Sequence, residues 1–314
     1  MSRQRRPQEL LDGPFSTGTA RKHGVTSKQL RSSGWRQVVH GVHVAANVPD
    51  SLELRTASIR LILPPDAVVG YTAAAWLHGA DVRDRRRSDV EVIAQRGDQI
   101  RRVGISATSA LLEPCDVTEL FGIPVTTPTR TAFDLGRQRD LIEAVVGIDA
   151  MLNRGNCRLD DLAVYTASHR RWRGVRSAEV ALAHAEPLAQ SPMESRQRMR
   201  LVLEGLPRPR AQTPVSDNGI VFAYIDNGYE QWRVGTDYDG DPHKDRWRYD
   251  LERQERIRDQ DWWHRRYTSL HIHSGWRQMV RQVGDALVAA GWRPDLADHA
   301  QTALLSALRR ALSA

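Results

Sequence analysis

Apolar residues recur along the chain in short runs whose spacing alternates between helical and extended periods. Residues 7–11, 17–23 and 27–33 have helical spacing, and residues 35–46 alternate around His40 and Gly41 like a two-stranded hairpin. Further on, the pattern predicts helices at 52–63, 72–78 and 140–152, another starting near Thr129, and a strand at 89–94. Beyond Pro192 it predicts helix, three-stranded meander, helix, strand and helix, with the middle elements at 210–215, 221–229, 233–239, 245–261 and 265–269. The chain is therefore expected to be α/β, of the α+β kind.

This order of elements divides the 314 residues into three expected domains. They are a winged helix-turn-helix at 1–48, a mixed α/β scaffold at 51–188, and a further α/β domain at 191–314. The proline-containing stretch 187–192 is the expected linker, which makes the C-terminal part independently foldable.

The charge of the chain favours a polyanionic partner. There are 45 Lys and Arg against 38 Asp and Glu, and the pI is near 9.8, although an arginine-rich composition can also arise without any nucleic-acid binding. Cys115 and Cys157 have no metal-ligand spacing, and no stretch approaches the about 20 apolar residues of a membrane span. We expect a cytoplasmic protein that binds DNA, with no membrane contact and no small-molecule cofactor, and the oligomeric state is left open.

The N-terminal segment carries the expected DNA contacts. Gly24 suits the left-handed residue that ends one helix, and Thr26 can cap the next. The candidate nucleic-acid-binding residues are Lys28, Gln29 and Arg31 on that helix and Arg36 on the following strand. A small helical adaptor with a solvated polar face is the alternative interpretation.

Several motifs resemble a known family. They are the basic helix at Gly-Val-Thr (24–26), Val-Val-His-Gly-Val-His (38–43), Tyr-Thr-Ala-Ala-Ala-Trp-Leu-His-Gly (71–79) and Gly-Ile-Pro-Val-Thr-Thr-Pro-Thr-Arg-Thr (122–131). Together they are similar to the N-terminal part of AbiEi-type antitoxin-domain proteins of actinobacteria. The resemblance covers about half the chain and implies a winged helix and transcription-type DNA binding.

Carboxylates of the C-terminal third are spaced for convergence. Asp237 and Asp239 lie two apart on one strand, and Asp226 precedes Asp237 by eleven positions. If the connecting turn is centred on Gln231 and Trp232, antiparallel pairing places Asp226 across from Asp237. A cluster of this kind needs a hard cation, so we expect Mg²⁺ or Mn²⁺ held by Asp226, Asp237 and Asp239. Such a cation would activate water for phosphodiester hydrolysis.

A competing turn at Asn227-Gly228 would instead put Asp226 about 26 Å from Asp237. The later turn is favoured because the early one would leave the Asp-Asn-Gly turn at 217–219 in mid-ladder.

The order Ser-Pro-Met-Glu (191–194), Asp226, then Asp-Tyr-Asp-Gly-Asp-Pro-His (237–243) resembles the very-short-patch-repair-like branch of PD-(D/E)XK nucleases. The resemblance implies a PD-(D/E)XK restriction-endonuclease-like fold for residues 191–314. It also adds Glu194 as a support for the metal and His243 as the residue that positions water or phosphate. Two positions depart from the pattern: Asp237 stands where it has Glu, and Asp239 where classical members have Lys.

Two functions remain open at this point. One is a DNA-binding, metal-dependent endonuclease. The other is a non-enzymatic, antitoxin-like transcriptional regulator of a toxin-antitoxin system, whose nuclease fold is degenerate. If the carboxylates repel each other, Asp237→Asn should leave folding unchanged or improve it.

Overall fold

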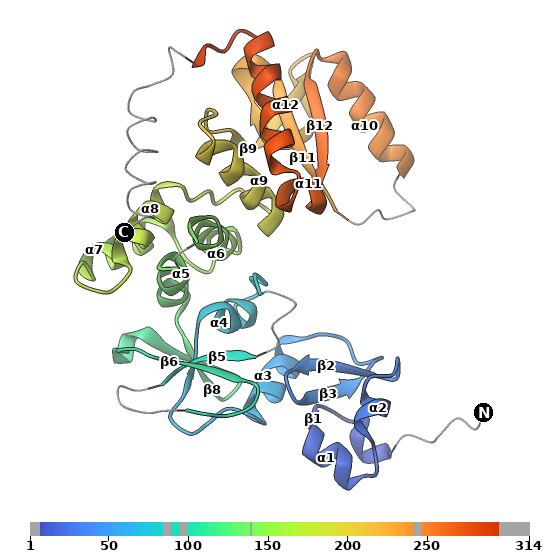
Figure 1. Cartoon of the computed structure of the whole chain (residues 1–314), viewed down its shortest axis with the longest axis vertical. Coiled ribbons are helices and arrows are strands. Elements are labelled where there is room, and N and C mark those ends of the chain that lie inside the picture. Colours follow the sequence, from blue (N-terminus) through green and yellow to red (C-terminus); the bar gives the residue numbers. More distant parts are fainter. Residues whose placement is uncertain (1–6, 84–88, 95–99, 139, 241–246, 295–314) are drawn as a thin grey trace. The chain divides into compact units, whose positions relative to one another are not determined.

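The structure is a computed structural model that describes residues 7–83, 89–94, 100–138, 140–240 and 247–294 (Figure 1). The chain splits into two compact units, Met1–Leu135 and Gly136–Ala314. Each contains both helices and sheet, so the mixed α/β class is confirmed.

The first unit begins with short helices and a three-stranded antiparallel sheet. Its elements are η1 (Gln8–Leu10), β1 (Phe15–Ser16), α1 (Thr17–Lys22), α2 (Ser27–Leu30), β2 (Trp35–Val39) and β3 (Val42–Ala45). Strand β3 lies between β1 and β2. Gly24 has a left-handed φ of 76° after α1, and Thr26 caps α2 in a reciprocal capping box with Gln29. The sequence pattern predicted these helices and the hairpin but not the two-residue strand β1.

Helix α2 is shorter than the pattern predicts, because it ends at Leu30 rather than residue 33. The Ser32 hydroxyl donates a 2.7 Å hydrogen bond to the carbonyl of Gln29, and the Ser32 backbone N–H donates to the same oxygen. A serine that bonds to the preceding turn in this way competes with helix continuation.

The rest of the first unit surrounds a five-stranded mixed sheet with the order β6-β5-β4-β8-β7. Its elements are α3 (Leu52–Arg60), β4 (Val68–Val69), α4 (Tyr71–Leu77), β5 (Val90–Ala94), β6 (Ile105–Ser109), η2 (Pro114–Asp116), β7 (Val117–Leu120), β8 (Ile123–Thr126) and α5 (Pro128–Gly136). Ile59, Trp76, Val92 and Val125 belong to one buried core. Burial of each such side chain contributes about 1.5–3 kcal/mol.

A buried arginine fixes α5 in this unit. The Arg130 side chain is fully buried and pairs with Asp116 at 2.7 Å and with Asp134 at 2.8 Å. It also donates a 3.0 Å hydrogen bond to the carbonyl of Leu111. A charge without access to water needs such partners, so the set ties α5 to the segment before β7.

The second unit opens with the helices α6 (Leu141–Asn153), α7 (Leu159–Ser168), α8 (Val175–Ala183) and α9 (Pro192–Leu203). Helix α6 packs against α8 and α9. A buried ion pair of 2.7 Å joins Asp149 of α6 to Arg198 of α9, and Ser195 donates a 2.6 Å hydrogen bond to the same carboxylate oxygen. These contacts cross the boundary that the sequence suggests between residues 188 and 191. The three-domain division itself stays a prediction.

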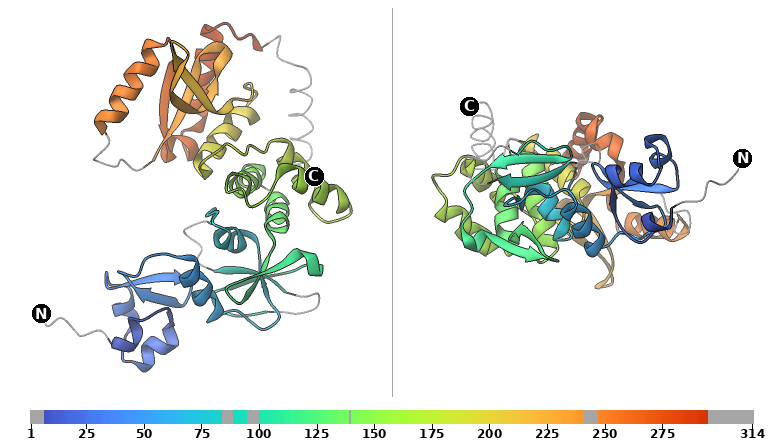
Figure 2. Two further views of the ribbon diagram at one scale, coloured as in Figure 1. Left: turned by 180° about the vertical axis from the view of Figure 1, so that it is seen from behind. Right: turned by 90° about the horizontal axis from the view of Figure 1, so that it is seen from below.

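The second unit continues as a four-stranded sheet between helices. Its elements are β9 (Arg210–Asp217), β10 (Ile220–Tyr229), η3 (Glu230–Trp232), β11 (Val234–Asp239), α10 (Trp247–Asp259), β12 (Trp263–Thr268), α11 (Ser269–His273) and α12 (Trp276–Ala289). The order is β12-β11-β10-β9, and only the β11–β12 pair is parallel, which the crossover through α10 allows. Helix α10 covers one side of the sheet, and α9 and α12 cover the other (Figure 1, and from behind in Figure 2).

Candidate functional site

Asp226 and Asp237 come into contact on neighbouring strands of the second unit. The chain turns at η3, and the pairing of Asn227 with Thr236 brings Asp226 beside Asp237. The backbone N–H of Asp226 donates a 3.0 Å hydrogen bond to Oδ1 of Asp237, and the N–H of Tyr238 donates a 2.8 Å bond to Oδ2 of Asp226. The later of the two expected turns is therefore the one that forms.

Asp237 is in contact with two basic side chains. Arg253 of α10 donates a 2.9 Å hydrogen bond to Oδ2 of Asp237. Nε2 of His264, on β12, lies 3.0 Å from the same oxygen. The distance is that of an ion pair, but the angles are outside the range of an ordinary hydrogen bond. Burial raises the pKa of Asp237, but the contact with His264 and the charges of His264 and Arg253 outweigh it, so the pKa lies below its ordinary value. Asp237 is thus an ionised, buried carboxylate.

Asp226 and Glu194 form the less neutralised part of the cluster. The side-chain amide of Gln212 donates to both carboxylates, at 3.3 Å to Glu194 and 3.4 Å to Asp226. Among the residues that the structure describes, neither carboxylate has a basic side chain in ion-pair contact. Burial, together with the charges of Asp237 and Glu194, raises the pKa of Asp226 to about 8. Burial also raises the pKa of Glu194, against the hydrogen bond from the Gln190 N–H.

Gln212 has an unusual backbone for a strand residue. Its φ of 48° lies in the left-handed region that side-chain-bearing residues rarely adopt. Strained residues of this kind are concentrated at functional sites, where the surrounding structure holds them in place. The strain places an amide between two acidic side chains.

The remaining predicted ligands lie differently. Asp239 forms a 2.6 Å ion pair with Arg266 of β12, and about a third of its side chain is exposed. His243 lies outside the described residues. Sequence reasoning missed Gln212, Arg253 and His264. Of the three, only Arg253 could have been suspected from the sequence, because it is one of several arginines on a charged helix.

The cluster contains the oxygen ligands of a hard-cation site, but they are not arranged to coordinate a cation. Carboxylate oxygens are the ligands that Mg²⁺ and Mn²⁺ prefer, and Asp226, Asp237 and Glu194 supply them. Within the described ranges, however, there is no group of three or more His, Cys, Asp or Glu side chains placed to hold a metal ion. The Gln212 amide and Arg253 instead bond to the oxygens that a cation would use.

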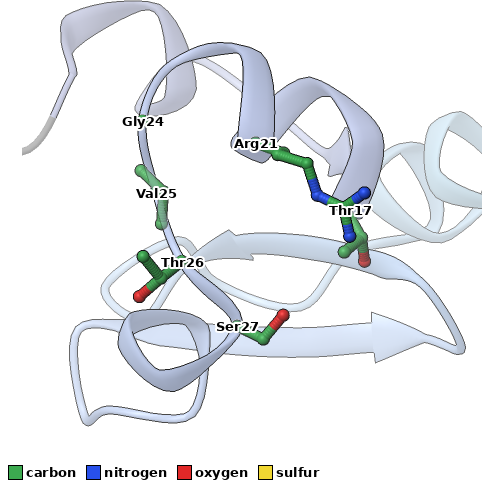
Figure 3. Close-up of a pocket in the computed structure, with 6 residues that line it drawn as sticks. All are labelled: Thr17, Arg21, Gly24, Val25, Thr26 and Ser27. Atoms are coloured by element: carbon green, nitrogen blue, oxygen red, sulfur yellow. The ribbon is translucent and has the colours of Figure 1, made fainter.

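The N-terminal candidates are divided between exposed and structural positions. Lys28 and Arg31 are exposed. The amide oxygen of Gln29 accepts the N–H of Thr26 in the capping box, and Arg36 donates a 3.0 Å hydrogen bond to the carbonyl of Val48. A pocket lies beside them, lined by Thr17 and Arg21 of α1 and by residues 24–27 (Figure 3).

The family match covers the region between the two candidate sites. Residues 67–184 match the AbiEi antitoxin C-terminal domain. Two uncharacterized proteins of Mycobacterium tuberculosis, from two strains, are 27% identical to the chain over 224 residues. The aligned part makes up 67% of this chain and 76% of each relative.

The family match includes only some of the motifs that resemble antitoxin-domain proteins in the sequence. The motifs at 71–79 and 122–131 fall inside the matched residues, whereas those at 24–26 and 38–43 fall before them. The match is also to the C-terminal domain of the antitoxin, not to its N-terminal part. The carboxylate cluster begins at Glu194, after the match ends, so an antitoxin-type domain is supported and a nuclease domain gains nothing from the comparison.

In the described part of the chain, no helix is both long enough and apolar enough to cross a membrane.

Proposed function

We propose that this protein is a DNA-binding regulator of the antitoxin type, and that its N-terminal unit binds duplex DNA as a winged helix. The match of residues 67–184 to an antitoxin domain is the observation that carries the proposal. The arrangement of α1, α2 and the β2–β3 hairpin supports it, because a capped second helix with exposed basic residues is suited to a major groove. The net charge of +7 would favour association with the DNA backbone.

Binding of the full chain to duplex DNA tests this proposal. Affinity should fall steeply with salt, and the double variant Lys28→Ala, Arg31→Ala should reduce the slope of log K against log salt by about two. A matched control is Arg210→Ala, Arg233→Ala, which removes the same charge from exposed residues that form surface ion pairs. No salt-dependent binding at low ionic strength, or an equal loss in both variants, would refute the role of the N-terminal unit.

The carboxylate cluster favours a second candidate function, hydrolysis of DNA phosphodiesters in a PD-(D/E)XK-like site. Its support is the contact between Asp226 and Asp237, with the pKa of Asp226 raised to about 8 next to an ionised neighbour. Asp226, Asp237 and Glu194 would hold a divalent cation, which when bound supplies an activated water and screens the phosphate. Arg253 and His264 keep Asp237 ionised, and Gln212 orients Asp226 and Glu194.

Calorimetry with Mn²⁺ alone separates the two candidates. For the second function, the wild-type chain should bind Mn²⁺, and Asp226→Asn should lose both binding and plasmid nicking. Asp239→Asn is the matched control, since Asp239 is paired with Arg266 instead of the cluster. If the wild type binds no Mn²⁺ at millimolar concentration, the hydrolytic function fails while the DNA-binding regulator is unaffected.

A further inference from the structure

The turn between α7 and α8 carries an unneutralised cluster of arginines. The cluster consists of Arg170, Arg171 and Arg173 on this turn and of Arg176 in the first turn of α8, and all four are exposed. Between Asp161 and Glu179 the chain has no acidic residue. Among the residues that the structure describes, no acidic side chain is in ion-pair contact with any of the four. Their positive charges therefore lie close together without an internal counter-charge.

The backbone of this turn is held by an aromatic stack. The ring of Tyr165 stacks on His169 with centroids 4.1 Å apart, and His169 meets Trp172 edge-on at 4.5 Å. Trp172 in turn lies under the guanidinium of Arg137, 5.6 Å from its centroid. These contacts fix the segment from which the arginines project.

Arg137 also closes the end of the turn. It donates a 3.0 Å hydrogen bond to the carbonyl of Arg173. Gly174 follows with a left-handed φ of 81°, and a Cβ there would lie 3.1 Å from both Cβ and the carbonyl oxygen of Arg137. The turn is thus an ordered platform, so binding through it would lose less conformational entropy than binding through a flexible loop.

We propose that this arginine turn is a second nucleic-acid-binding surface, which grips the phosphate backbone of DNA without reading its sequence. Guanidinium groups match phosphate oxygens with paired N–H donors, and clustered like charges are relieved when a polyanion binds. Three of the four arginines lie on the connection between α7 and α8, and phosphate-backbone contacts of this kind position a protein without specifying bases. The inference extends the proposed DNA-binding function to a surface that the N-terminal unit does not supply.

The test is the full-length triple variant Arg170→Gln, Arg171→Gln, Arg173→Gln, which leaves Arg137 and the aromatic stack intact. Its control is Arg210→Gln, Arg233→Gln, Arg281→Gln, which removes the same charge from exposed arginines elsewhere in the same unit. Binding to duplexes of random sequence is measured by fluorescence anisotropy over a series of salt concentrations. The turn variant should lose about tenfold or more in affinity for DNA at low salt. The slope of log K against log salt should fall by about two to three. Replacing the same three arginines with lysine should keep most of the slope, because the charge is retained.

The Lys28→Ala, Arg31→Ala variant, measured in parallel, separates this inference from the proposed function. Loss of slope in the turn variant supports the second surface even if the N-terminal variant binds normally. If the turn variant and its control have the same affinity and slope, the inference is overturned. It is equally overturned if the turn variant loses binding to poly-glutamate but binds DNA as the wild type does. The surface would then be suited to an acidic protein.

Discussion

The backbone N–H of Asp226 donates a hydrogen bond of 3.0 Å to the carboxylate of Asp237, so two acidic residues are in contact across neighbouring strands. Their environments shift the pKa values of the two carboxyl groups in opposite directions. The pKa of Asp237 is lowered by His264 and Arg253 against the effect of burial, whereas burial and neighbouring carboxylates raise the pKa of Asp226 to about 8. The same chemical substitution at the two positions should therefore have opposite consequences.

Asp226→Asn should stabilise the protein above neutral pH. Asp226 keeps its proton in the folded state up to pH of about 8, while in the unfolded chain its pKa returns to 3.8. The folded state thus holds more protons between these values, and stability falls as pH rises through the window. Asparagine does not ionise, so the gain should be near zero at pH 4 and grow towards pH 8, with an upper limit of about 6 kcal/mol at about 1.4 kcal/mol per pH unit. Urea unfolding at both pH values measures it, and an equal loss of stability at both would contradict the expectation.

Asp237→Asn should destabilise the protein, in contrast to the expectation from sequence that removing this charge relieves repulsion. The carboxylate is the counter-charge of Arg253 and lies 3.0 Å from Nε2 of His264, whose side chain is only 2% exposed. Removing one partner of a buried ion pair costs about 3 kcal/mol. Asp239→Asn, two residues away in a partly exposed pair, should cost no more than about 1 kcal/mol. Thermal unfolding of both variants at pH 7 provides the comparison.

His184 should make the protein sensitive to acid. Burial, with the charges of Arg208 and Arg198, lowers its pKa from 6.5 to about 4. The unfolded state therefore binds more protons between these values, and stability is lost as pH falls from 6.5 towards 4. Protonation of His184 should lower the free energy of unfolding by about 3 kcal/mol across this window, at about 1.4 kcal/mol per pH unit. His184→Gln should flatten the stability profile in this window, whereas His273→Gln, at an exposed position on α11, should leave it unchanged.

A fragment of residues 188–314 should fold poorly, and one of residues 136–314 should fold well. The shorter fragment leaves Arg198, whose side chain is fully buried, without Asp149. An unpaired buried charge destabilises by about 3–5 kcal/mol. Solubility and thermal unfolding of the two fragments test this, with Asp149→Asn in the full chain as the single-residue counterpart. A stable, cooperative 188–314 fragment would contradict this expectation and support the boundary that the sequence suggests.

Most elements of the second unit could be predicted because their periodicity is local. The turn between β10 and β11 was harder, since Asn227-Gly228 is a strong hairpin signal. Both residues serve packing instead. The Asn227 amide donates hydrogen bonds to the Glu194 carbonyl and to Gln197, and a Cβ on Gly228 would lie 2.6 Å from Thr213.

The partners of the carboxylates could not be predicted in this way. Arg253 lies 16 residues after Asp237, and the contact depends on how α10 packs on the sheet. The left-handed φ of Gln212 leaves no mark in the sequence either, because glutamine rarely adopts it. Local patterns therefore predict strands and their pairing, while the charges around a site depend on tertiary packing.

The ion pair between Asp149 and Arg198 also sets an order of events during synthesis. The two residues are 49 positions apart, so at about 5–20 residues per second the ribosome produces Arg198 roughly 2–10 s after Asp149. During that interval α6 can form as a helix, but its packing surface for α9 is uncovered and the carboxylate of Asp149 has no counter-charge. The packing of α6 against α9 can therefore form only after α9 has left the exit tunnel, and until then this surface of the nascent chain is exposed to water.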